Sequence, residues 1–186
     1  MCFQGCPYTQ AAVPVIVELF MTQSVSRPVI LLVDDNPHDV VLIRLAFRKV
    51  GIIDTIQLVK DGTEAVRYIQ GNGNYTDRHQ FPAPTLVLLD LKMPQTSGFD
   101  VLRWIRERPE LSHIIVVVMS GSKEDGDIEK AYSLGASAYL VKPTKFEDLV
   151  KMMENLKDYA TWQKKGESAR PRMGNLFSED SLVPAF

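Results

Sequence analysis

From residue 29 onward the sequence alternates short apolar runs with longer stretches in which apolar residues recur at helical spacing. Short apolar runs bounded by turn residues are typical of buried strands, whereas apolar residues at every third or fourth position indicate amphipathic helices. The apolar runs predict strands at 29–33, 55–60, 85–90, 113–119 and 137–141. The stretches between them predict helices at about 38–50, 63–70, 98–108, 123–134 and 145–163.

Strictly alternating strands and helices predict an α/β fold with a parallel sheet covered on both faces. Right-handed crossovers favour the flavodoxin-like (βα)5 three-layer sandwich with strand order 2-1-3-4-5. Pro37 suits the first turn of a helix, and Gly51 and Gly135 suit helix ends. In this order the carboxyl ends of the first and third strands flank a crevice where ligands bind.

Acidic residues follow two of these strands. Asp34 and Asp35 close the first apolar run, and Asp90 closes the third. Because the strands are expected to be parallel, the three carboxylates should meet at one edge of the sheet. They would repel each other unless a divalent cation lay among them, and oxygen ligands of this type suit Mg²⁺.

The amino-acid composition argues against several classes of protein. The 186 residues carry a formal net charge of -2, which gives no electrostatic case for binding nucleic acid. No apolar stretch is long enough to span a membrane. The two cysteines, Cys2 and Cys6, both lie at the N-terminus, so a disulfide framework is not expected and a cytoplasmic location is favoured.

We expect one domain at 28–163 with an extension on each side. Residues 1–27 form the N-terminal extension, and Met21 is interpreted as the natural start, which makes the residues before it an upstream addition. Residues 164–186 carry charges of both signs with Gly and Pro, which predicts a flexible tail. The polar segment 71–84 is interpreted as a loop insertion on the side of the sheet opposite the acids.

Other strand ends also carry groups suited to phosphoryl chemistry. Asp90 can act as a nucleophile, Ser120 offers a hydroxyl donor and Lys142 offers a positive charge. More ordinary roles exist for each residue. Asp34 or Asp35 could cap the following helix, and Tyr139 could be plain packing.

These motifs together resemble the receiver domain of two-component response regulators, over about residues 28–163. They are DD at 34–35, DLKMP…G at 90–98, SG at 120–121 and YLVKP at 139–143. The DDNPHD segment at 34–39, the 71–84 loop and the lack of an output domain further resemble the small response regulators of cyanobacterial and bacterial phytochromes.

The resemblance implies a phosphoryl group transferred from a kinase histidine to Asp90. It implies Mg²⁺ bound directly by Asp35 and Asp90 and by the backbone carbonyl of Lys92, with Asp34 acting partly through water. Lys92 and Ser122 would occupy the two positions that tune dephosphorylation.

The resemblance also implies a switch. Lys142 would pair with a phosphoryl oxygen, aimed by a cis Lys142–Pro143 bond. Ser120, which stands where threonine is commoner, would hydrogen-bond the phosphoryl group, and Tyr139 would then move inward.

Two apolar surpluses predict interfaces. Val40 and Ile43 on the first helix are expected to contact the kinase. On the last helix, Met152, Tyr159 and Trp162 are expected to help form a homodimer, together with the 123–134 helix and the 137–141 strand.

The sequence thus predicts a stand-alone phosphoacceptor that signals through protein contacts and is not an enzyme. A haloacid dehalogenase-type phosphatase is one alternative, but such enzymes have a second acid two residues after the nucleophile, where this chain has Lys92. The other alternative is a pseudo-receiver that binds partners without phosphorylation, which would have a broken acid site.

Overall fold

The computed structural model describes residues 29–52, 56–94, 96–162 and 182–183. The predicted N-terminal extension and the interpretation of Met21 as the start lie outside these residues. Within the described part, no helix is long and apolar enough to cross a membrane.

The sheet has the predicted order, with one strand added at its edge. The order is β2-β1-β3-β4-β5-β6, and β1 to β5 are all parallel. β1, β3, β4 and β5 are fully buried, which explains why their sequences are continuously apolar rather than alternating. The strands are β1 (Ile30–Val33), β2 (Ile56–Val59), β3 (Leu86–Leu89), β4 (Ile115–Ser120), β5 (Ala138–Val141) and β6 (Leu182–Val183).

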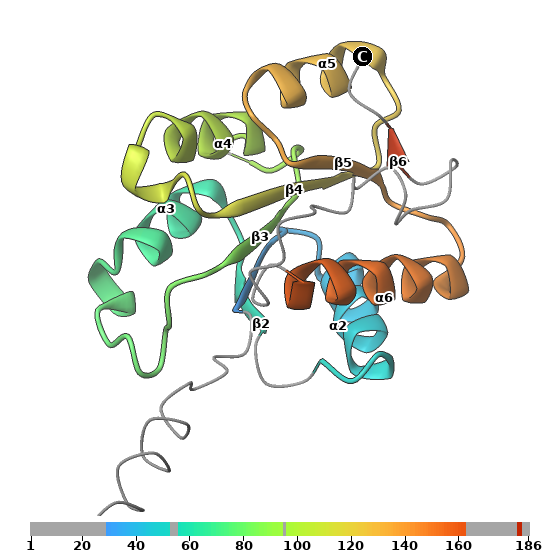
Figure 1. The fold of residues 1–186 in the computed structure, drawn as a ribbon, viewed down its shortest axis with the longest axis horizontal. Coiled ribbons are helices and arrows are strands. Elements are labelled where there is room, and N and C mark those ends of the chain that lie inside the picture. Colours follow the sequence, from blue (N-terminus) through green and yellow to red (C-terminus); the bar gives the residue numbers. More distant parts are fainter. Residues whose placement is uncertain (1–28, 53–55, 95, 163–181, 184–186) are drawn as a thin grey trace, which may run out of the picture.

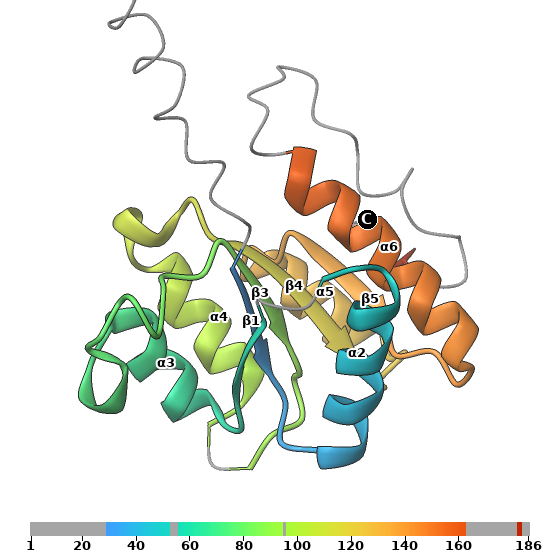
Figure 2. The same ribbon diagram turned by 90° about the horizontal axis from the view of Figure 1, so that it is seen from below.

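Helices cover both faces of the sheet, as expected. In Figures 1 and 2, α2 and α6 lie on one face, and α3, α4 and α5 lie on the other. The helices are α2 (Pro37–Lys49), α3 (Gly62–Gln70), α4 (Gly98–Arg106), α5 (Asp125–Ser133) and α6 (Phe146–Trp162), with 3-10 turns η1 (Gly73–Tyr75) and η2 (Pro109–Leu111).

The orientation of α2 corrects the first predicted interface. Val40 and Ile43 are buried against the sheet with Ala46 and Phe47, at the spacing of one helical face. The exposed apolar residues of this helix lie instead on its opposite face and are Val41, Leu42 and Leu45. The apolar surplus is therefore real, but the residues assigned to it were wrong.

The second predicted interface also changes. Met152 is 2% exposed and packs in the core beneath α6, so it cannot contribute to a surface stripe. Tyr159 and Trp162 lie outside the residues whose side chains the structure describes.

The C-terminal segment contributes β6, which the sequence analysis did not predict. Leu182 and Val183 pair antiparallel with Leu140 and Tyr139 of β5. Part of the segment expected as a flexible tail therefore covers the outer edge of β5 (Figure 1).

The 71–84 insertion lies at the amino end of β3, away from Asp90 at the other end of that strand. The Arg78 guanidinium donates to the carbonyls of Tyr68 at 2.9 Å and Phe81 at 3.1 Å. The rings of Tyr68, Tyr75 and Phe81 contact one another with centroids 5.1 to 6.2 Å apart. These contacts anchor the insertion to α3.

Candidate functional site

Two acids of the site come from the end of β1. Asp34 is only 1% exposed, and its Oδ1 accepts a hydrogen bond from the backbone N–H of Asn36 at 2.9 Å. Asn36 caps α2 by accepting from the N–H of His38 at 3.0 Å. The capping role considered for Asp34 or Asp35 is thus taken by Asn36, which leaves both carboxylates available to the crevice.

The third acid comes from the end of β3. Asp90 is 8% exposed, its N–H donates to the carbonyl of Val33 at 2.9 Å, and its Oδ1 accepts from the N–H of Lys92 at 3.4 Å. Asp34, Asp35 and Asp90 each offer an oxygen, and these oxygens lie within 4.8 Å of one another. Three hard oxygen donors this close fit one divalent cation, as the sequence predicted.

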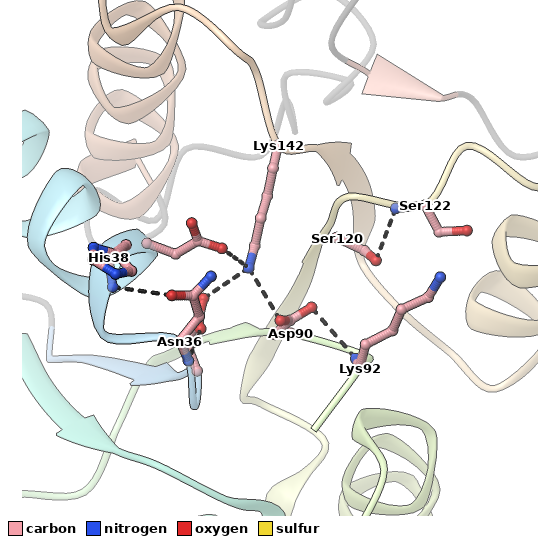
Figure 3. A network of polar contacts seen from close by, with 9 residues as sticks. Asn36, His38, Asp90, Lys92, Ser120, Ser122 and Lys142 are labelled. Atoms are coloured by element: carbon pink, nitrogen blue, oxygen red, sulfur yellow. Dashed lines mark hydrogen bonds and ion pairs between the residues drawn. The ribbon is translucent and has the colours of Figure 1, made fainter. Parts of the chain in front are cut away.

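Lys142, just after β5, reaches into this group of acids (Figure 3). Its Nζ lies 2.9 Å from Asp34 Oδ2, 3.0 Å from Asp90 Oδ2 and 2.8 Å from Asp39 Oδ2. Asp39, in the first turn of α2, was not among the predicted site residues. An acid there is an ordinary partner for the helix dipole, so its residue type alone did not single it out.

Burial and charge oppose each other at this site. Burial lowers the pKa of Lys142, but hydrogen bonds to Asp39 and Asp34 and the charge of Asp90 raise it above its usual range. Burial raises the pKa of Asp34, although the Lys142 hydrogen bond lowers it in part. Lys142 therefore remains an ammonium among carboxylates that have few other partners.

The predicted cis peptide at Pro143 is wrong. The described residues contain no cis peptide bond, so Lys142–Pro143 is trans. The trans isomer is the favoured one even before proline. With this bond trans, the Lys142 Nζ contacts all three acids.

The predicted switch residues lie together beside the acids. Ser120 is fully buried at the end of β4, and its Oγ accepts from the N–H of Ser122 at 3.2 Å (Figure 3). Tyr139 is also fully buried, and its hydroxyl donates to the carbonyl of Ser122 at 3.1 Å. The tyrosine ring is therefore already inward in this structure. Ser122 is buried as well, whereas Lys92 is exposed.

The family model of the response regulator receiver domain matches residues 30–154. This chain belongs to that family. The match spans all five parallel strands and includes every acid described above, together with Lys142. Members of the family accept a phosphoryl group rather than turn over a substrate, so the chain is a phosphoacceptor and not an enzyme.

Three similar proteins are regulatory or signalling proteins by name. The probable methanogenesis regulatory protein FilR2 of Methanothrix harundinacea is 38% identical over 70% of this chain and 82% of its own. Response regulator Rcp1 of Synechocystis sp. is 34% identical over 70% of this chain and 87% of its own. The crystal structure of RPA3017, described as acting in red light signaling of R. palustris, has a TM-score of 0.67 at 34% identity, covering 71% and 92%.

A metal-bound structure is also similar. The Mn²⁺-bound form of Rcp1 has a TM-score of 0.64 at 32% identity, covering 77% of this chain and 99% of the other. It holds a divalent cation, in agreement with the acidic group of this chain. The chain thus has the acidic metal-binding group of a receiver. It is also similar to the phosphorylated cyanobacterial phytochrome response regulator RcpA, with a TM-score of 0.67 at 31% identity, covering 76% of this chain and 98% of the other.

Substitution of Gly98 tests how strongly the site depends on close backbone packing. A Cβ at Gly98 would clash with the backbone oxygen of Asp90 and would lie 2.8 Å from the Cα of Leu91. We expect Gly98→Ala to lower the free energy of unfolding by about 1–3 kcal/mol or more, because the start of α4 must move off the end of β3. Urea denaturation measures this change.

Gly126 provides the matched control, since it is also near the start of a helix and a Cβ there would meet nothing within 4 Å. Gly126→Ala should leave stability unchanged or raise it by up to about 1 kcal/mol. Equal stability of the two variants would contradict the close contact at Gly98.

Proposed function

We propose that this chain is a stand-alone phosphorylation switch that accepts a phosphoryl group from a sensor histidine kinase onto Asp90. The observation that carries the proposal is the position of Asp90, next to Asp34 and Asp35 and 3.0 Å from the ammonium of Lys142. A nucleophilic carboxylate, a cation site and a fixed positive charge are the parts that phosphoryl transfer requires.

In the proposed step, an oxygen of Asp90 attacks the phosphorus of a phosphohistidine. The O–P bond forms as the P–N bond breaks, and the imidazole leaves with the electron pair and takes up a proton. Asp34, Asp35, Asp90 and the Lys92 carbonyl would hold Mg²⁺, which when bound neutralises charge on the phosphoryl oxygens. Lys142 already lies at the Asp90 carboxylate, where it can pair with a phosphoryl oxygen.

Ser120 and Tyr139 would change conformation when Asp90 is phosphorylated. Ser120 Oγ would give up its contact with the Ser122 N–H to hydrogen-bond the phosphoryl group. Because the hydroxyl of Tyr139 is bonded to the same residue, Ser122, the two side chains are coupled through one backbone segment. Lys92 and Ser122 would set the lifetime of the phosphoryl group.

The kinase we propose is of the phytochrome type, meeting this chain in the cytoplasm. The similarity to RcpA, a cyanobacterial phytochrome response regulator, and to RPA3017 of red light signaling supports this pairing. The kinase would dock on this chain at the exposed apolar residues of α2. One of them, Leu42, lines a shallow pocket that also includes Lys142 and Pro143.

Replacement of Leu42 tests the docking surface. Leu42→Glu should reduce transfer from the kinase by about tenfold or more, because a charge replaces an apolar contact next to the site. The rate of transfer from acetyl phosphate is the internal control and should stay unchanged. An equal loss with both donors would show damage to the site rather than to docking.

A homodimer through α5, β5 and α6 is part of the same proposal. The edge of β5 is covered by β6, so contacts would come from the helices rather than from strand pairing. Sedimentation velocity before and after phosphorylation should show a shift from monomer to dimer. A monomer in both states would refute this part of the proposal.

Asp90→Asn tests the central proposal. With Mg²⁺ and acetyl phosphate, the wild type should gain one phosphoryl group by intact mass and the variant none, because an amide oxygen is not a nucleophile here. Asp148→Asn, an exposed acid on α6, should behave as wild type. A wild type that gains nothing from any donor would favour a binding module that works without phosphorylation.

A further inference from the structure

Asp39 makes the shortest of the three ion pairs to Lys142, at 2.8 Å. The others, to Asp34 and Asp90, are 2.9 and 3.0 Å. A lysine ammonium has three N–H donors, so the three carboxylates can use all of them. Asp39 is thus a full partner of Lys142 rather than a distant neighbour.

Asp39 differs from the other two partners in what else it can bind. Among the described residues, the acids whose oxygens lie close enough together to share an ion are Asp34, Asp35 and Asp90, and Asp39 is not one of them. Its side chain is 31% exposed, against 1% for Asp34 and 9% for Asp90. Asp39 therefore contacts the lysine from outside the cation-binding group.

This arrangement sets Lys142 and a divalent cation in competition. Both are positive, and both need the carboxylates of Asp34 and Asp90. A cation entering the group weakens the hold of these two acids on the ammonium. The pair with Asp39 does not depend on those oxygens, so it offsets part of the cost of releasing the lysine.

We infer that Asp39 is a positioning residue, which holds Lys142 on the α2 side of the crevice so that a divalent cation can occupy Asp34, Asp35 and Asp90. The inference rests on the proposed function, because it concerns the same site. Asp39 acts through Lys142 and touches neither the phosphoryl group nor the cation.

A double-mutant cycle tests this role, with Mn²⁺ alone as the probe and free Mn²⁺ measured by electron paramagnetic resonance. Asp39→Asn should weaken Mn²⁺ binding by about threefold or more, because the lysine loses its alternative partner. In a Lys142→Met background the same substitution should change the affinity by less than about twofold, since there is no ammonium left to position. Lys142→Gln is a second background if the Met variant is not folded by thermal unfolding.

Asp148→Asn is a closely matched control. Asp148 is also the third residue of a helix, α6, and is also paired with a lysine, Lys151, at 3.4 Å. The Asp148→Asn substitution should leave Mn²⁺ binding unchanged in both backgrounds. It therefore distinguishes the effect of losing any acid near the start of a helix from the effect of losing the contact with Lys142.

Two results would overturn the inference. An equal loss of affinity in the presence and absence of Lys142 would mean that Asp39 acts only through its charge, and unchanged or tighter binding in Asp39→Asn would mean that it does not assist the cation. Either result leaves the proposed function intact if wild type still gains a phosphoryl group at Asp90. Wild type that binds no Mn²⁺ and gains no phosphoryl group would instead refute the proposed function.

Discussion

The structure depends on how it neutralises the carboxylates that its parallel strands bring together. Asp34 and Asp90 end adjacent strands and are almost fully buried, so each needs a positive partner or a hydrogen-bond donor. Lys142 provides that partner from β5, two strands away from β3 in the sheet. One ammonium cannot balance four acids, and the remaining negative charge makes the crevice a favourable place for a cation.

The fold meets this electrostatic requirement through backbone geometry. Asn36 caps α2 and at the same time directs its own N–H to Asp34, so the start of the helix and the acid are fixed by one residue. Gly98 lets the start of α4 lie directly against the carbonyl of Asp90. A cation or a phosphoryl group that binds in this crevice therefore changes the local charge while the surrounding backbone has little room to move.

The sheet order and the acids could be predicted because strand periodicity and parallel topology together determine which strand ends meet. The buried face of α2 could not be predicted, because residues 40–43 are all apolar. Such a run does not determine which side of the helix faces the sheet. Met152 was misplaced for the same reason. Asp39 and β6 depend on contacts between segments far apart in the sequence, which no local pattern encodes. The bond before Pro143 was assigned by resemblance alone, and the structure has it trans.

β5 connects the charged site to the edge of the molecule. It carries Tyr139 within the strand and leads directly to Lys142, and it pairs with β4 on one side and β6 on the other. The Lys142 N–H also donates to the carbonyl of Ser120 at 2.8 Å, so the lysine and the serine are joined through the backbone. A movement of the Lys142 backbone would strain this contact with the end of β4, where Ser120 lies. On its other edge β5 pairs with β6, through Tyr139 with Val183 and Leu140 with Leu182. The strand that carries Tyr139 and leads to Lys142 is thus hydrogen-bonded on both edges, by β4 and by β6.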